Sequence, residues 1–251
     1  MKQATNYTDQ KYWDKYYKTT SAQVEQIEKI CSEYDELWDK WIRCCARPPR
    51  NVIEIGAYPG RYLAYFASKY GLEVTGLDFN SDTEKIKTSM ETMGITNYHL
   101  IHADFLTHQP DEKYDLVFSN GFIEHFEDYQ RVLDLHVPYL NENGALMVMI
   151  PNLNYTRKYF GMAVDRANLK MHNLKCMNLR TFTEFANRNH FKTVYLGYFG
   201  GFAYAPHTTD LNLIQKITAK VFRLIFKKLN PYLRKHPTRW YSCNIIAIFK
   251  K

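Results

Sequence analysis

The chain has 251 residues, of which 45% are hydrophobic and 24% charged. This mixture is typical of a folded globular domain and excludes disorder over most of the length. No apolar run reaches the ~18 residues of a membrane-spanning helix, and the first twenty residues lack the apolar core of a signal peptide. The five cysteines show no CxxC spacing, which predicts neither a disulfide framework nor a cysteine metal site, so we expect a reducing, cytoplasmic compartment.

The positive charge is concentrated near the C-terminus. The chain has 33 basic and 26 acidic residues, and residues 201–251 hold ten of the basic residues but a single acid, Asp210. The basic residues of this segment are Lys216, Lys220, Arg223, Lys227, Lys228, Arg234, Lys235, Arg239, Lys250 and Lys251. Such a segment indicates an anionic partner, which is a phosphate group, a nucleic acid or a lipid headgroup.

Two helices are predicted at the start of the chain. The first carries aromatic side chains at Tyr12, Trp13, Tyr16 and Tyr17. The second is expected over 21–46, where apolar residues recur three and four positions apart, as on one buried face of a helix. It should end before Pro48, because proline cannot continue a helix.

Strands and helices then alternate. Short apolar strands are expected at 51–55, 72–77, 98–102, 114–118 and 145–150, with helices at 61–70, 81–93 and 129–140. Thr181 and Glu184 have the spacing of a capping box for a helix that reaches His190. Two final strands are expected at 191–198 and 241–249. This alternation predicts a Rossmann-like α/β fold, with a parallel sheet and helices on both faces.

A single domain is expected, because no linker or internal repeat interrupts the chain. Its parts would be a helical cap at 1–47, a cofactor-binding core at 48–200, a basic helical insertion at 201–240 and the last strand at 241–251.

A glycine turn follows the first predicted strand. Gly56 ends the strand and Gly60 opens the next helix, and glycine there permits positive φ and close approach of a ligand. Asp78 ends the second predicted strand, where a carboxylate can accept hydrogen bonds from both hydroxyls of an adenosine ribose. Since ligands bind at the carboxyl edge of a parallel sheet, a nucleoside cofactor is predicted there.

Two cofactors use this geometry. The dinucleotide fingerprint GxGxxG requires a glycine where this chain has Tyr58, so that fingerprint fails. S-adenosylmethionine instead needs acceptors for its ammonium group and donors for its carboxylate. Glu54 just before the turn, together with the backbone of the turn, suits this second cofactor.

Five segments resemble, in order and spacing, the motifs of class I S-adenosylmethionine-dependent methyltransferases of the small-molecule type. They are VIEIGAYPGRYL from Val52, GLDFN from Gly76, HADF from His102, YDLVFSNGFIEHF from Tyr114 and NENGALMVMIPN from Asn141. The resemblance covers about 51–152 and implies S-adenosylmethionine as the cofactor and the strand order 3-2-1-4-5-7-6, with strand 7 antiparallel. One departure is Tyr58, which replaces the middle glycine of the first motif and so reshapes the methionine pocket.

The resemblance also implies which residues bind the cofactor. Asp104 would accept a hydrogen bond from the adenine amino group, and Phe105 would border the adenine ring. The expected set is Glu54, Gly56, Ala57, Tyr58, Gly60, Asp78, Phe79, Asp104, Phe105 and Asn120.

His125 is the candidate catalytic residue. Methyl transfer from a sulfonium depends mainly on in-line positioning, but a hydroxyl acceptor usually also needs a base. His125 follows the fourth predicted strand, on the rim where the methyl group should lie; the alternative is that it only packs or hydrogen-bonds there. His102 and His136 are expected to be structural. No His, Asp or Glu cluster has clear metal spacing, so no metal is predicted.

The region beyond the fourth strand narrows the acceptor. Enzymes that methylate base amino groups commonly carry an Asn-Pro-Pro-aromatic motif where this chain has SNGF from Ser119. Acceptor contacts are expected on the rim after the fifth strand and on residues 198–204, which are expected to form a mobile aromatic loop. The expected residues are Asn152, Tyr155, Arg157, Lys158, Tyr198 and Tyr204.

A basic amphipathic helix is expected over 211–229, ending at Asn230-Pro231. One stripe of it carries Lys216, Lys220, Arg223 and Lys227, and apolar residues occupy much of the rest. This pattern favours docking to anionic lipid or to a phosphorylated substrate. The alternative is a helix packed on the domain with a solvated basic face.

These observations predict an enzyme that O-methylates a phosphorylated, nucleotide-linked or lipid-linked sugar, as in polysaccharide biosynthesis, in the cytoplasm or at the inner face of the membrane. One alternative is an RNA-directed methyltransferase, which the near-neutral body of the chain disfavours. The other is a non-catalytic S-adenosylmethionine-binding protein, for which Tyr58 is the only support.

Overall fold

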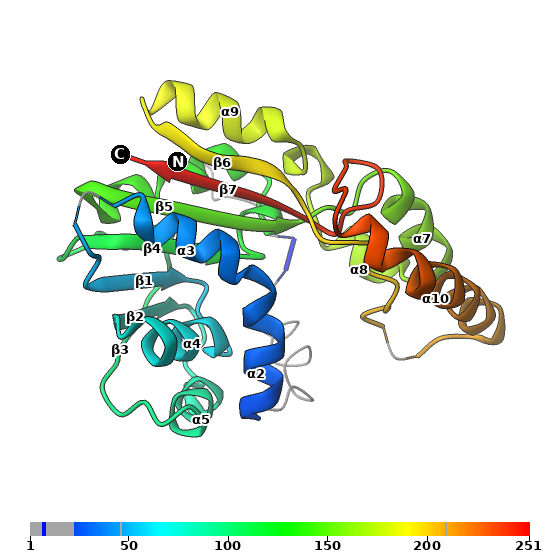
Figure 1. Ribbon diagram of the computed structural model, residues 1–251, viewed down its shortest axis with the longest axis horizontal. Coiled ribbons are helices and arrows are strands. Elements are labelled where there is room, and N and C mark those ends of the chain that lie inside the picture. The colour runs from blue at the N-terminus through cyan, green and yellow to red at the C-terminus, as the bar shows by residue number, and fades with distance from the viewer. Residues whose placement is uncertain (1–6, 9–22, 46, 209) are drawn as a thin grey trace.

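The computed structural model describes residues 7–8, 23–45, 47–208 and 210–251. A seven-stranded sheet crosses the middle of the protein, with helices on both sides (Figure 1). Its strands are β1 Asn51–Ile55, β2 Glu73–Asp78, β3 His99–His102, β4 Tyr114–Asn120, β5 Leu140–Pro151, β6 Lys192–Phe199 and β7 Asn244–Lys250. The predicted aromatic helix around Tyr12 and Trp13 lies outside the described residues.

The strand order is β3-β2-β1-β4-β5-β7-β6. Strands β1 to β5 pair in parallel with their neighbours, whereas β7 runs antiparallel to both β5 and β6. The predicted fold class and strand order are therefore confirmed. The carboxyl ends of β1, β2 and β4 meet at the edge of the sheet where parallel α/β proteins bind ligands.

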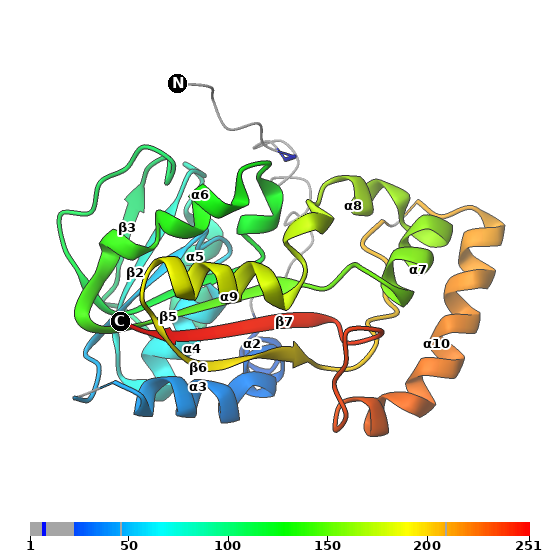
Figure 2. The same ribbon diagram turned by 90° about the horizontal axis from the view of Figure 1, so that it is seen from above.

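Each face of the sheet has its own hydrophobic core. One core packs α2 Val24–Cys31, α3 Asp35–Arg43, α4 Arg61–Tyr70 and α5 Glu84–Thr92, and the other packs α6 Tyr129–Asp134 and α9 Leu179–Arg188 (Figure 2). In β5, Met147 and Met149 belong to the first core, and Leu146 and Val148 belong to the second. This burial on both faces explains the continuous apolar run in the sequence.

The single helix expected over 21–46 is wrong, because the helix is broken in the middle. A 3-10 turn, η1 Ser32–Tyr34, separates α2 from α3, and Tyr34 leaves helical geometry with φ −105° and ψ 0°. Its ring packs 5.6 Å from Trp38 and 5.2 Å from Phe199. The break lets α2 pack on α4 while α3 packs along β5.

The predicted capping box of α9 is also wrong. The helix begins at Leu179, and the side chain of Asn178 caps it by accepting a hydrogen bond from the Thr181 N–H at 3.0 Å. Thr181 therefore lies inside the helix, and Glu184 pairs with Arg180 on its exposed side. The helix expected at 129–140 also ends early, because α6 stops at Asp134 and a 3-10 turn, η3 Val137–Tyr139, precedes β5.

Three further helices lie beyond the carboxyl end of β5, at the end of the molecule farthest from α3 and β3 (Figures 1 and 2). They are α7 Thr156–Val164, α8 Arg166–Lys170 and α10 Leu213–Leu233, and we call them the distal helices. The sequence analysis expected α10 but no helix between β5 and α9. Phe160 of α7 and Phe222 and Phe226 of α10 form a separate small core around Phe202.

The segment 198–204 is packed in place, so the expectation of a mobile aromatic loop is wrong. Tyr198 belongs to β6, and Phe202 is only 1% exposed. The side chain of Asn230 receives a hydrogen bond from the Phe202 N–H at 2.8 Å and donates one to the Phe202 carbonyl at 3.0 Å. The predicted end of this helix at Asn230-Pro231 is also wrong. Helix α10 continues through Pro231 to Leu233.

Among the described residues, no helix is both long enough and apolar enough to cross a membrane.

Candidate active site

The turn between β1 and α4 is held to the end of β2 by backbone contacts. The N–H groups of Gly56 and Ala57 both donate to the carbonyl of Leu77, at 2.9 and 3.3 Å. Gly56 has φ +73°, and a Cβ there would lie 2.6 Å from the ring of Phe122. The glycine is therefore required both for the backbone angle and to admit Phe122, a packing role that the sequence did not indicate.

Asp78 joins the ends of β1 and β2. Its Oδ2 accepts from the Tyr58 N–H at 3.0 Å and its Oδ1 from the Asn80 N–H at 2.8 Å. Burial raises the pKa of Asp78, while these two backbone hydrogen bonds oppose the rise. Because each carboxylate oxygen has two acceptor positions, Asp78 retains the capacity to accept from ribose hydroxyls.

Glu54 lies beneath the turn on β1. It is 3% exposed, and its Oε2 has no hydrogen-bond partner among the described residues. Burial raises the pKa of Glu54 well above its usual range, and the nearby Arg61 opposes that rise. A buried carboxyl oxygen that lacks a partner fits the role of an acceptor for the ammonium group of a methionine moiety.

The adenine-side residues fall into two groups. The ring of Phe79 is 63% exposed at the end of β2, so it is free to pack against a flat ligand. Asp104 is exposed and accepts from the Leu106 N–H, whereas Phe105 is buried against Phe122. Phe105 is thus a core residue, and the adenine roles of Asp104 and Phe105 stay predictions.

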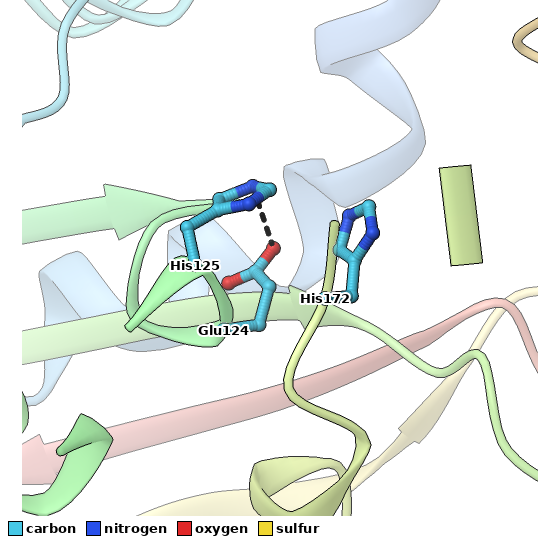
Figure 3. Close-up of side chains that lie close together, drawn as sticks. All are labelled: Glu124, His125 and His172. Atoms are coloured by element: carbon cyan, nitrogen blue, oxygen red, sulfur yellow. Dashed lines mark ion pairs between the residues drawn. The ribbon is translucent and has the colours of Figure 1, made fainter. Parts of the chain in front are cut away.

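His125 is buried in a 3-10 turn, η2 Ile123–His125, just beyond β4. Its Nδ1 faces the Met171 carbonyl at 2.9 Å, and Figure 3 shows Glu124 and His172 beside it. Burial lowers the pKa of His125 to about 3, with His172 adding to the decrease, so the imidazole is neutral at physiological pH. That pKa is far from the range that favours general-base catalysis, and the catalytic role of His125 stays a prediction.

Glu124 and His172 complete a buried group that the sequence analysis missed. Glu124 is fully buried, its carboxyl oxygens have no hydrogen-bond partner among the described residues, and its Oε1 lies 3.9 Å from Nε2 of His125. Burial raises the pKa of Glu124 to about 8 and lowers that of His172 to about 4. Because Glu124 is then largely protonated and His125 is neutral at neutral pH, the contact between these two side chains is not an ion pair there. His172 lies far from Glu124 in sequence, so no motif spacing indicated that the two side chains meet.

The other buried histidine is structural, as expected. His136 is completely buried, its Nδ1 faces the Val132 carbonyl at 2.9 Å, and its Nε2 lies 3.1 Å from Oγ of Ser119. Asn120, the next residue of β4, donates from its side chain to the Tyr62 hydroxyl at 3.0 Å. Tyr62 is a residue near the turn that the sequence analysis did not select.

Arg157 is the most unusual of the predicted acceptor residues. It lies on α7, is 6% exposed, and its Nε and Nη1 have no hydrogen-bond partner among the described residues. The rings of Phe160 and Phe202 lie 5.6 and 5.5 Å from its guanidinium carbon. Burial lowers the pKa of Arg157, and the carboxylate of Asp165 partly opposes this.

The remaining predicted acceptor residues have different surroundings. Both amide hydrogens of Asn152 are used, because its Nδ2 donates to the carbonyls of Arg239 and Ser242. Asn152 therefore anchors the chain before β7, which corrects its expected role as a substrate contact. Tyr155 has a φ of +53°, and such uncommon backbone angles often occur at functional positions. Its ring packs on Trp240. Lys158 is exposed, and Tyr198 and Tyr204 are half-buried.

The sheet order, the glycine turn and the acidic residues at the ends of β1 and β2 define a class I methyltransferase that uses S-adenosylmethionine. The contacts of Glu54, Asp78 and Phe79 with the ammonium group, the ribose and the adenine of that cofactor stay predictions. A family model described as a methyltransferase domain matches residues 22–195, and the chain belongs to that family.

Curated relatives match only part of the chain. Trans-aconitate 2-methyltransferase of Agrobacterium fabrum is 29% identical over 103 residues, which cover 41% of this chain and 39% of that protein. (S)-coclaurine N-methyltransferase of Papaver somniferum is 25% identical over 136 residues, covering 53% of this chain and 37% of the relative. The chain thus spans well under half the length of these relatives.

Solved structures share the fold over nearly the whole chain. A S-adenosylmethionine-dependent methyltransferase from Archaeoglobus fulgidus has a TM-score of 0.58 at 18% identity, covering 97% of this chain and all of that one. Coclaurine N-methyltransferase bound to N-methylheliamine and S-adenosylhomocysteine has a TM-score of 0.56 at 16% identity, covering 87% of this chain and 70% of its own. At these identities the likeness shows the fold alone.

Proposed function

We propose that the chain transfers a methyl group from S-adenosylmethionine to a hydroxyl of an anionic, glycan-type acceptor. The candidate acceptors are a phosphorylated sugar, a nucleotide-linked sugar and a lipid-linked sugar. The observation that carries this proposal is Arg157. Two nitrogens of its buried guanidinium lack partners among the described residues, which is costly unless an anion pairs with them.

The surroundings of Arg157 support an external anion. Asp165, the carboxylate that acts on the pKa of Arg157, already accepts hydrogen bonds from the N–H groups of His207 and Thr208 and from the Thr208 hydroxyl. Phe160 and Phe202 flank the guanidinium with apolar surface. A phosphate or carboxylate of the acceptor would therefore meet a desolvated cation, where charged hydrogen bonds are short and strong.

The chemistry of the transfer asks for positioning above all. S-adenosylmethionine supplies a methyl group on a sulfonium, which is a good leaving group. Asp78, Glu54 and Phe79 would fix that cofactor, and Arg157 would fix the acceptor, so that the two reacting atoms meet in line. The predicted role of His125 is to accept the hydroxyl proton, and the observation behind it is its position just beyond β4.

Helix α10 favours the lipid-linked form of the acceptor. Its inner face packs through Phe222 and Phe226, yet much of its apolar surface faces outward. The exposed apolar residues are Leu213, Ile214, Ile217, Val221, Leu224, Ile225 and Leu229. The cations of the helix lie on its exposed surface too, and an apolar stripe among cations is typical of helices that lie on anionic membranes. The proposed function therefore includes a reaction at the cytoplasmic face of a membrane.

The test is a kinetic comparison of Arg157→Met with the wild type, using phosphorylated, nucleotide-linked and lipid-linked sugars as acceptors. Losing charged hydrogen bonds of ~1.5–3 kcal/mol each should raise the acceptor KM by at least about tenfold, while the affinity for S-adenosylmethionine stays the same. Arg180→Met is the matched control, because Arg180 is exposed on α9. An unchanged acceptor KM in Arg157→Met would contradict the proposal.

Two further results would redirect the proposed function. Binding of RNA that weakens steeply with salt, together with RNA methylation, would favour an RNA-directed enzyme. Cofactor binding without transfer to any of these acceptors or to RNA would favour a non-catalytic binding protein.

A further inference from the structure

The group formed by Glu124, His125 and His172 has the donor set of a metal site. One donor atom from each residue, a carboxylate oxygen or a ring nitrogen, lies within 4.8 Å of the others. Figure 3 shows the three side chains gathered together, with Glu124 and His125 coming from η2 and His172 from the loop after α8. We propose that these three residues bind a divalent transition-metal ion.

Glu124 is the first argument for an ion. Its carboxyl group is buried, and neither oxygen has a hydrogen-bond partner among the described residues. A carboxylate in that position needs a cation or donors to offset the loss of hydration. The other two members of the group are the imidazoles of His125 and His172. An ion bound between the carboxylate and these imidazoles would give each of the three side chains a partner.

The outer contacts of the two histidines are the second argument. Nδ1 of His125 lies 2.9 Å from the Met171 carbonyl, and Nδ1 of His172 lies 2.7 Å from the Asn168 carbonyl. Histidines that bind metals typically donate one ring N–H to such an acceptor, which orients the ring and leaves the other nitrogen for the ion. In the metal-bound state His172 would bind through Nε2. His125 would exchange one of its present contacts for the ion and would then act as a ligand in place of the base predicted above.

Asn173 fixes the distance between η2 and the loop that carries His172. Its backbone N–H donates to the carbonyl of Glu124 at 2.7 Å, and its side chain donates to the carbonyls of Phe126 and Glu127. The loop that carries His172 is thereby tied to η2. Metal–ligand bonds of ~2.0–2.2 Å bring ligand atoms closer together than 4.8 Å, so side-chain movements of about an ångström would complete the site.

Two imidazoles and one carboxylate suit Mn²⁺, Fe²⁺ or Zn²⁺ and leave coordination positions open. The cluster directly follows Phe122, whose ring lies against Gly56 of the cofactor turn, so an ion there would be close to the predicted cofactor site and could serve the acceptor. This use rests on the proposed function. The ion would bind the acceptor oxygen after its proton leaves to water. The oxygen then bonds to the methyl carbon as the bond from that carbon to sulfur breaks, and sulfur keeps the electron pair.

Metal binding can be tested without any acceptor or cofactor. Chelator-treated wild-type protein is titrated with Mn²⁺, and bound ion is followed by electron paramagnetic resonance and calorimetry. We expect one site, with Glu124→Gln and His172→Gln each weakening Mn²⁺ by more than about tenfold. Glu127→Gln and His99→Gln, at exposed positions just after η2 and on β3, should bind Mn²⁺ like the wild type.

Thermal unfolding of each variant shows whether it is folded, and the wild-type titration stands even if a variant is not. Absence of a site for Mn²⁺, Zn²⁺ and Fe²⁺ in the folded wild type, or wild-type affinity in both ligand variants, would overturn the metal site. Metal binding without methyl transfer would keep the site and reject the proposed function. Full transfer in chelator without metal binding would do the reverse.

Discussion

The cofactor end of the protein and the distal helices are built from different kinds of contact. At the cofactor end, the turn after β1 is joined to the end of β2. The Gly56 N–H donates to the Leu77 carbonyl, and the Tyr58 N–H donates to the Asp78 carboxylate. In the distal helices, Phe160, Phe202 and Phe226 meet from three separate segments. The first region follows local rules of strand, turn and helix, whereas the second depends on long-range packing.

The largest expected effect separates these regions by stability. Phe202→Ala removes a fully buried ring from the small distal core and should cost about 3–5 kcal/mol of folding free energy. Phe79→Ala removes an exposed ring. It should leave the free energy of unfolding unchanged and weaken the binding of S-adenosylmethionine. Chemical denaturation and calorimetry measure both variants. Equal stability losses in the two would show that the division between the regions is wrong.

The next effect concerns α10 and the membrane. Replacing Lys216, Lys220, Arg223 and Lys227 by Gln should release the protein from anionic vesicles, since each cation near such a surface contributes about 1 kcal/mol. Cofactor affinity should not change, because the cofactor end lies at β1 and β2. Vesicles with and without anionic lipid are compared by co-sedimentation. If the wild-type protein does not bind anionic vesicles, the alternative holds that α10 is a packed helix with a solvated basic face.

The smallest effect tests the corrected cap of α9. Asn178→Ala should cost about 0.5–2 kcal/mol, because it removes the side-chain acceptor for the Thr181 N–H. Glu184→Gln should leave the thermal midpoint unchanged, because its partner Arg180 is exposed. The reverse ranking would restore the cap that the sequence favoured.

The sequence predicted the fold and the turn after β1 well because their signals are local. Apolar strands alternate with helices, Gly56 directly follows β1, and Asp78 is the last residue of β2. The predicted helix over 21–46 failed because Tyr34 packs against Phe199, a contact that no local pattern records. The predicted end of α10 at Asn230-Pro231 failed because Asn230 is held by Phe202, and the two residues are far apart in sequence.

The acceptor side was only partly predictable for the same reason. Arg157 was selected for its charge, but its burial between Phe160 and Phe202 depends on the distal packing. Glu124 was not selected, although it directly precedes His125. Its significance comes from His172, which the loop after α8 brings back to η2 through Asn173.

The central claim is that the carboxyl edge of β1 and β2 binds S-adenosylmethionine through Asp78, and calorimetry of Asp78→Ala tests it most directly. Two lost hydrogen bonds to a charged acceptor, at ~1.5–3 kcal/mol each, should weaken S-adenosylmethionine by at least about a hundredfold. Asp111→Ala, at an exposed turn, is the control, and thermal unfolding confirms that each variant is folded. A folded Asp78→Ala protein that binds S-adenosylmethionine with wild-type affinity would contradict the account.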